Sequence, residues 1–159
     1  MRLDELDRRI VAHLLEDGRA SYAQIGDRVG LSAPAVKRRV DRLRAEGVIT
    51  GFAAVVEPAA LGWGAEAFIE IFCTGATSPD EIYSSIRNHP EVVAAYTVSG
   101  DASALVHVRV RDIQHLEQTL ERLRREDNIT ATKTAIVLSR LIGRPTDTPA
   151  RPTEPVRTP

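Results

Sequence analysis

The chain has 159 residues, of which 43% are hydrophobic and 27% charged, as is ordinary for a folded globular protein. A single cysteine, Cys73, excludes an internal disulfide, and no run of about 20 apolar residues is present to span a membrane. The first residues are too acidic for a secretory signal, so the cytoplasm is the expected compartment. Residues 1–50 carry ten basic and eight acidic side chains, whereas residues 51–143 carry eight and twelve, so phosphate contact is more expected from the first part.

The first 50 residues have the spacing of three short helices. Apolar side chains recur at helical intervals over residues 4–17, and Ser21 begins a capping box that opens a second helix. Ser32 is an N-cap candidate for a third helix, with Pro34 in the first turn, where its missing N–H is tolerated. Two short helices joined by a tight turn and preceded by another helix predict a helix-turn-helix.

The third helix carries a dense positive face. Five of the eight residues from Lys37 to Arg44 are basic, against one acid. At about 100° per residue, Arg38 and Arg42 point away from the apolar stripe, and Lys37 and Arg39 flank them. Arginine can donate two hydrogen bonds to guanine in the major groove, whereas flanking basic side chains mostly contact phosphates. We therefore assign Arg38 and Arg42 to base edges, and Lys37 and Arg39 to the DNA backbone.

The start of the third helix belongs to the same predicted surface. The Ser32 hydroxyl can donate to a phosphate beside the free backbone N–H groups of the helix. A basic helix can also be merely solvated, its charges serving solubility, but the preceding helix and turn make that interpretation the weaker one. The predicted partner is double-stranded DNA, and the predicted DNA-binding residues are Ser21, Ser32, Pro34, Lys37, Arg38, Arg39 and Arg42.

The pattern changes after the third helix. Short β-prone pieces over residues 48–56 predict a small wing or connecting strand. From residue 65 the order strand, helix, strand, strand, helix, strand predicts a ferredoxin-like βαββαβ arrangement. The fold class is therefore α+β, with a winged helix-turn-helix domain over residues 1–50, a wing or linker strand over 51–64, a ferredoxin-like domain over 65–143 and a disordered Pro-rich tail over 144–159.

One face of the predicted sheet lacks a cover. Ala67, Ile69 and Ile71 alternate with Phe68 and Phe72 along the first strand, so both faces carry apolar side chains. Both helices of a ferredoxin-like domain lie on one face of the sheet. A second subunit is the simplest cover for the other face, because small domains bury more apolar surface by pairing.

A loop between two predicted strands is the first candidate for binding a small molecule. Ser99, Gly100, Asp101, Ala102 and Ser103 form this segment, in which glycine frees the backbone and Asp101 offers a carboxylate to an amino group. On composition alone a plain hairpin turn is the better interpretation, since Gly, Asp and Ser are favoured turn formers.

The hydroxyls of the last predicted strand, on Thr132 and Thr134, are equally compatible with solvent-facing strand formers and with ligand contacts.

The sequence offers little for an enzyme. Its four histidines, His13, His89, His107 and His115, show no metal-ligand spacing with Cys73, and no Gly-rich phosphate loop or nucleophile elbow is present. We expect His13 to be a structural residue and His107 to lie on a sheet face. The prediction is a protein that is no enzyme and has neither cofactor nor metal.

Four segments together resemble the Lrp/AsnC family, also called feast/famine regulators. They are Leu3-Asp4-Glu5-Leu6-Asp7-Arg8-Arg9-Ile10 with Asp17-Gly18-Arg19-Ala20-Ser21, then Gly30-Leu31-Ser32, and then Arg38-Arg39-Val40-Asp41-Arg42-Leu43-Arg44-Ala45-Glu46-Gly47-Val48-Ile49. The resemblance covers about residues 3–142. It implies transcription regulation at inverted-repeat sites, dimers that assemble into rings such as octamers, and amino acids as effectors.

The resemblance also bears on the effector site. In such proteins the hairpin matching residues 99–105 lies between dimers and binds the effector, which raises the standing of Gly100 and Asp101 and gives Thr132 and Thr134 a modest role as neighbours. The family often has Gly-Asp-x-Asp-Tyr where this chain has Gly100-Asp101-Ala102-Ser103-Ala104. The missing acid and aromatic imply a wider pocket, a shifted specificity or no effector at all.

Two other functions stay open. The chain is also similar to sirohaem decarboxylases, which share the two-domain layout but whose helix-turn-helix region has lost its DNA role, and the dense basic face argues against that enzyme. A sensing module that binds metabolites without DNA is the third possibility. Enrichment of an inverted repeat from random DNA would favour the regulator over both.

Overall fold

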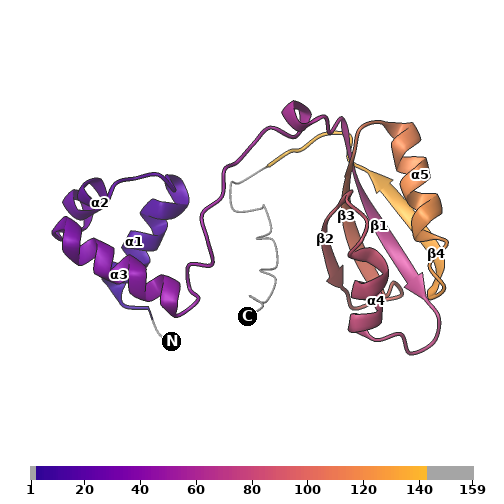
Figure 1. The fold of residues 1–159 in the computed structure, drawn as a ribbon, viewed down its shortest axis with the longest axis horizontal. Coiled ribbons are helices and arrows are strands. Elements are labelled where there is room, and N and C mark those ends of the chain that lie inside the picture. The colour runs from indigo at the N-terminus through magenta and orange to yellow at the C-terminus, as the bar shows by residue number, and fades with distance from the viewer. Residues whose placement is uncertain (1–2, 143–159) are drawn as a thin grey trace, which may run out of the picture. The chain divides into compact units, whose positions relative to one another are not determined.

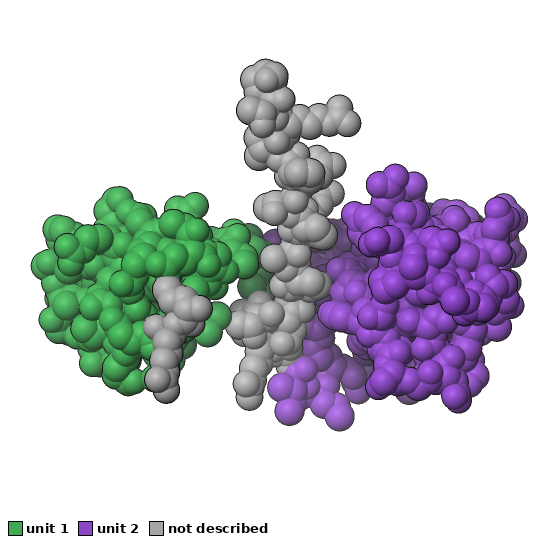
Figure 2. All heavy atoms as spheres, turned by 90° about the horizontal axis from the view of Figure 1, so that it is seen from below, with its two compact units in different colours: residues 1–55, 144–159 green, residues 56–143 purple. Residues whose placement is uncertain are grey.

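The computed structural model describes residues 3–142, which form two compact units with the boundary between Val55 and Val56 (Figures 1 and 2). The first unit is helical, and the second is a sheet with two helices. The tail predicted over residues 144–159 lies outside the described residues. Within residues 3–142, no helix has the length and apolar character needed to cross a bilayer.

Three helices make up the first unit: α1 (Glu5–Glu16), α2 (Tyr22–Val29) and α3 (Ala33–Ala45). Asp4 and Ser21 cap α1 and α2 through reciprocal capping boxes, which satisfy backbone N–H groups that the first turn leaves free. The helices enclose one apolar cluster, formed by Ile10, Ile25, Val29, Val36 and Val40. The predicted helix-turn-helix is confirmed.

The turn between α2 and α3 is tight because two positions lack a side chain. Gly30 ends α2 with a positive φ of 74°, a conformation that glycine adopts without strain. A Cβ on Gly26 would lie 2.3 Å from the Leu31 carbonyl oxygen, so the backbone of the turn packs directly on α2. These two glycines set the close approach of α2 and α3.

The segment after α3 contains no strand. Residues 46–49 form a turn, in which the backbone N–H groups of Val48 and Ile49 donate to the Leu43 carbonyl oxygen, and residues 50–57 have no regular structure. This corrects the expectation of a wing strand over residues 48–56. A strand needs a hydrogen-bonded neighbour, and Ile49 instead packs half-buried against the helical core.

The second unit follows the predicted order of elements. After a short 3-10 helix (η1, Pro58–Leu61) come β1 (Ala65–Cys73), α4 (Pro79–Ile86), β2 (Val92–Thr97), β3 (Ala104–Val110), α5 (Ile113–Leu123) and β4 (Ile129–Ile136). The strands lie in the order β2-β3-β1-β4, and all neighbours are antiparallel. This is the ferredoxin-like arrangement, and the prediction is confirmed.

Both helices pack on the same face of this sheet. Ile82 of α4 and Leu116 of α5 belong to one buried cluster with Ile69 and Val106 of the central strands. The alternating residues of β1 point to the opposite face, where Phe68 remains 37% exposed. No helix of the second unit, within the described residues, covers that face (Figure 1).

Candidate DNA-binding surface and effector region

The first turn of α3 presents an unused hydroxyl. Ser32 is the N-cap of α3, as predicted, but its side chain makes no capping hydrogen bond and is exposed. Pro34 lies exposed in the same turn. Ser21 differs, because its hydroxyl donates to Gln24 Oε1 at 2.9 Å and accepts from the Gln24 backbone N–H. Of the two serines, Ser32 has the hydroxyl that is free to meet a ligand.

On the exposed face of α3, Lys37 is paired with a carboxylate whereas Arg38 is not. Lys37 Nζ lies 2.6 Å from Asp41 Oδ2, one turn along the same helix, and that hydrogen bond raises the pKa of Lys37. Arg38 is exposed, and its side chain has no hydrogen bond or ion pair with any residue from 3 to 142. Arg38 therefore offers its whole guanidinium to solvent.

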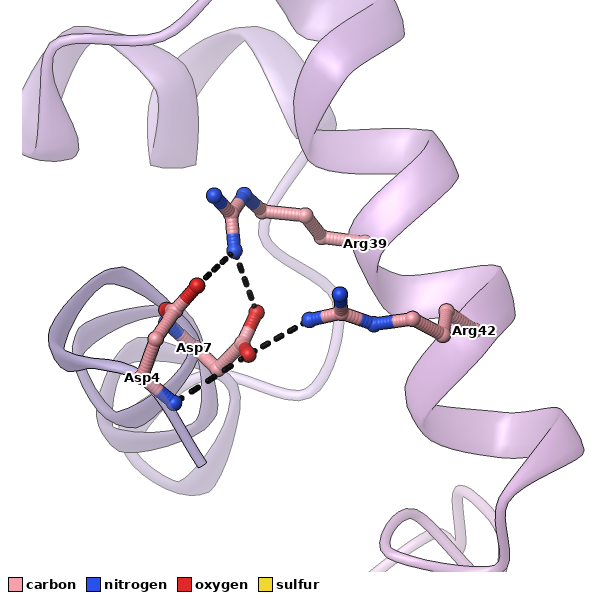
Figure 3. Close-up of polar contacts among 4 residues, drawn as sticks. All are labelled: Asp4, Asp7, Arg39 and Arg42. Atoms are coloured by element: carbon pink, nitrogen blue, oxygen red, sulfur yellow. Dashed lines mark hydrogen bonds and ion pairs between the residues drawn. The ribbon is translucent and has the colours of Figure 1, made fainter. Parts of the chain in front are cut away.

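Two further arginines of α3 reach toward α1 (Figure 3). Arg39 Nη1 donates to Asp4 Oδ2 at 2.6 Å and to Asp7 Oδ1 at 2.8 Å. Arg42 Nη2 donates to the other oxygen of Asp7, at 2.5 Å. The two carboxylates and two guanidinium groups form one continuous cluster, which we call the α1–α3 ion cluster.

The contacts of the α1–α3 ion cluster shift the pKa values of Asp4 and Arg39. The pKa of Asp4 lies below its ordinary value because Arg39 donates to the carboxylate and the Asp7 backbone N–H donates to it as well. The same hydrogen bonds to Asp4 and Asp7 raise the pKa of Arg39. Both shifts favour the charged forms of Asp4 and Arg39.

The α1–α3 ion cluster was not predicted from the sequence. Asp7 lies at helical spacing with Leu3, Ile10 and Leu14, on the apolar face of α1, and its side chain is nearly fully buried. A buried carboxylate requires a charged or hydrogen-bonding partner. An acid within an apolar stripe was thus the available signal, although it names no partner.

The predicted effector loop forms the turn between β2 and β3. Ser99, Gly100 and Asp101 are exposed, and Gly100 has a φ of 132°, in a region that side chains disfavour. Ser103 anchors the loop to β1, since its backbone N–H donates to the Ile71 carbonyl oxygen at 2.8 Å and its hydroxyl accepts from the Cys73 N–H at 3.0 Å. The tip of the loop is free while its base is fixed.

The predicted threonines lie at the same end of the sheet as this loop. Ile71 of β1 pairs with Ala104 on one side and with Thr132 on the other, so the three residues form one row across the sheet. Thr134 is in the next row, paired with Ile69. The threonine side chains therefore lie on the helix-covered face, where Thr132 Oγ1 accepts from Arg124 Nε at 2.9 Å.

Two cavities among the described residues lie away from this loop. One, of about 280 Å³, is in the first unit near His13 and Arg28, and another, of about 350 Å³, is in the second unit near His89 and Arg122. Neither is lined by a predicted effector residue. Within residues 3–142, no three His, Cys, Asp or Glu side chains are grouped to hold a metal ion.

The uncovered face of the sheet carries aromatic and charged side chains together. Phe68 stacks on His107 with ring centroids 4.7 Å apart, which confirms His107 as a sheet-face residue. Beside them Glu66 accepts from Arg109 Nε at 2.7 Å. Lys133 of the neighbouring strand β4 lies over the Phe72 ring of β1. This mixture suits a surface that a partner can cover.

Known proteins share both units of this chain. An AsnC-type helix-turn-helix domain matches residues 3–44, and an Lrp/AsnC ligand binding domain matches residues 66–147. The chain belongs to the Lrp/AsnC family. It is 50% identical over 143 residues to the HTH-type transcriptional regulator Rv2324 of Mycobacterium tuberculosis, covering 90% of this chain and 97% of that protein.

Solved structures of this family share the fold. The feast or famine regulatory protein Rv3291c of M. tuberculosis, in complex with L-methionine, matches with a TM-score of 0.84 at 34% identity, over 93% of this chain and all of that one. AsnC of E. coli matches with a TM-score of 0.84 at 32% identity, over 91% and 97%. These relatives favour a transcriptional regulator over the decarboxylase and the DNA-free sensing module.

Proposed function

We propose that the protein binds inverted-repeat DNA through α3 of two paired subunits, on the chromosome in the cytoplasm, and that an amino acid modulates this binding. The observation that carries the DNA contact is the exposed face of α3, where the unpaired Arg38 lies beyond the free Ser32 hydroxyl. Arg38 suits a guanine edge, because both of its N–H pairs are available. Ser32, with the first backbone N–H groups of α3, suits a phosphate.

The other basic residues of α3 take graded roles in this proposal. Arg42 is 46% exposed and has one nitrogen bound to Asp7, which leaves N–H groups for a second base edge. Lys37 is exposed beside Asp41 and suits a phosphate. Arg39 is 23% exposed and bound to two carboxylates, so any phosphate contact uses only its remaining N–H groups.

The uncovered face of the sheet supports subunit pairing. Phe68, Tyr96 and Leu105 share the uncovered face with charged side chains of the same strands, among them Glu66, Glu70 and Arg109. A second copy that covers this face would give the two-fold symmetry that an inverted repeat requires. Further association of dimers into an octamer or a similar ring is proposed from the family resemblance.

The effector is proposed to bind at the loop of residues 99–103. Asp101 offers a carboxylate to the ammonium group of an amino acid, and the exposed backbone around Gly100 can approach its carboxylate. The Rv3291c complex with L-methionine supports this class of ligand. Since the loop tip is exposed in one chain, a second dimer would complete the pocket, with Thr132 and Thr134 as neighbours behind the loop.

Selection from a random duplex library tests the DNA proposal. An enriched inverted repeat is expected, and Arg38→Ala should bind the enriched duplex roughly 10- to 100-fold more weakly with relaxed base preference at one position. Arg125→Ala is the matched control, because Arg125 is an exposed arginine of the second unit. Absence of enrichment, or equal affinity of Arg38→Ala and wild type, would refute the proposed DNA contact.

Thermal denaturation with each of the twenty amino acids tests the effector. A ligand that binds only the native protein raises the melting temperature, by a stabilisation of about 2.7 kcal/mol at 100 times its dissociation constant. Asp101→Asn should abolish that rise, whereas Glu117→Gln, an exposed acid on α5, should retain it. A rise that survives Asp101→Asn would place the ligand elsewhere.

A further inference from the structure

Asp7 is an unusual residue to find inside the first unit. Its carboxylate is only 2% exposed, it lies on the apolar side of α1, and each oxygen accepts from a different arginine of α3. Buried ion pairs are weak contributors to stability, because removing charges from water offsets most of their attraction. The carboxylate also closes the capping box of α1, because its Oδ2 accepts from the Asp4 backbone N–H at 3.4 Å, but a cap of this kind does not require the two arginines of α3.

The two arginines that Asp7 holds differ in what they leave free. Arg39 Nη1 donates to both Asp4 and Asp7, and the Arg39 side chain is mostly buried. Arg39 therefore links α3 to the start of α1. Arg42 is attached through Nη2 alone and is nearly half exposed. A guanidinium has five N–H donors, and the donors on Nε and Nη1 of Arg42 have no partner within residues 3–142.

We propose that Asp7 is a positioning residue for DNA recognition, whose buried carboxylate holds the Arg42 guanidinium with its free N–H groups turned outward. The inference rests on the proposed function of α3. A free arginine loses rotamer entropy when it binds a base, whereas an arginine already held in place loses less. Figure 3 shows both arginines extending from α3 toward α1, where each of them meets the Asp7 carboxylate.

The same carboxylate also limits non-specific binding. Asp4 and Asp7 place two negative charges against the cations of α3. Attraction to any duplex grows with the number of phosphates neutralised, and it is independent of sequence. Asp7 thus strengthens the oriented contact and weakens the uniform one, which raises the ratio of specific to non-specific affinity.

Asp7→Asn separates positioning from a purely structural role. Affinity is measured by fluorescence anisotropy at four salt concentrations, for the enriched operator and for a shuffled duplex of equal length. Operator affinity is expected to fall about tenfold, while affinity for the shuffled duplex rises severalfold and its salt slope steepens by about one. Asp41→Asn is the matched control, because it removes the same charge from the exposed face of α3 without touching Arg42; it should raise both affinities together.

Two outcomes would overturn the inference. If Asp7→Asn leaves the ratio of operator affinity to shuffled-duplex affinity unchanged, Arg42 needs no such support. The same conclusion follows if Asp7→Asn causes an equal loss of operator affinity in a protein that already carries Arg42→Ala. If Asp7→Asn does not fold, Arg42→Lys decides instead, since it keeps the charge at a partly exposed site but loses the planar fork. Arg42→Lys should bind the operator about tenfold more weakly and the shuffled duplex as the wild type does. If Arg42→Lys binds the operator with wild-type affinity, the inference is overturned. Failure of the wild type to enrich any operator refutes the proposed function instead.

Discussion

The two units of this protein complete their surfaces in opposite ways. The helical unit closes a small core of five fully buried aliphatic residues and reinforces it with the α1–α3 ion cluster. The sheet unit closes a larger core under two helices and leaves the other face, with Phe68 and Tyr96, open to solvent. The helical unit therefore exposes basic side chains, whereas the sheet unit leaves aromatic side chains exposed on its open face.

This difference assigns the two units different partners. A surface of arginine and serine attracts polyanions and stays soluble alone. The Phe68 and Phe72 side chains lie on one face of β1, and covering them with another apolar surface lowers the free energy of the system. This difference supports the proposals that nucleic acid binds the helical unit and that a further copy of the chain covers the sheet.

The largest effect is expected in the sheet core. Ile69→Ala removes a fully buried side chain between β1 and the helices, and it should lower the free energy of unfolding of this unit by about 2–5 kcal/mol. The only tryptophan, Trp63, lies in the same unit, so urea denaturation followed by its fluorescence reports the change. An unchanged midpoint would contradict the described core.

The next largest effect concerns the open face. Phe68→Asp should weaken self-association by about 2 kcal/mol or more, roughly 30-fold, because a charge replaces a central aromatic residue. Sedimentation equilibrium measures the change. Tyr83→Asp, on the exposed side of α4, is the matched control and should leave the association constant unchanged. Equal masses for all three proteins would remove the sheet face from the interface.

A smaller effect should distinguish the two serine caps. Ser78 accepts the Glu81 backbone N–H at the start of α4, so Ser78→Ala should destabilise the sheet unit by about 1 kcal/mol. Ser32 caps α3 without any side-chain hydrogen bond, so Ser32→Ala should leave the melting temperature unchanged and lower DNA affinity instead. Loss of stability in Ser32→Ala would mean that its hydroxyl serves the helix rather than DNA.

The smallest effect is expected from pH. Burial beside Phe68 lowers the pKa of His107 below the ordinary value of 6.5, and the nearby carboxylate of Glu66 only partly opposes this. The unfolded chain therefore binds a proton that the folded one resists, and stability falls as the pH drops below 6.5. Unfolding midpoints at pH 7.5, 6.5 and 5.5 should show this decline in the wild type and less of it in His107→Gln. Parallel profiles would contradict the prediction.

Local patterns in the sequence predicted most of the elements. Period-two alternation in β1 correctly separated Ile69 from Phe68, and Ser21 and Ser32 correctly marked helix starts. The prediction of a wing strand over residues 48–56 was wrong, because β propensity cannot supply the neighbouring strand that a sheet requires. The DNA-contact and effector residues stay predictions, although the structure brings Thr132 and the 99–103 loop to one end of the sheet.

The sequence by itself determined where the helices and strands lie, because capping, turn chemistry and hydrophobic periodicity act between residues only a few positions apart. It also determined that α3 is basic. Only the tertiary structure decided which of its cations are free, since Asp7 and Arg42 are 35 positions apart and meet only once α1 packs on α3. The availability of a charged group is a property of the packed chain, because it depends on what burial has placed beside it.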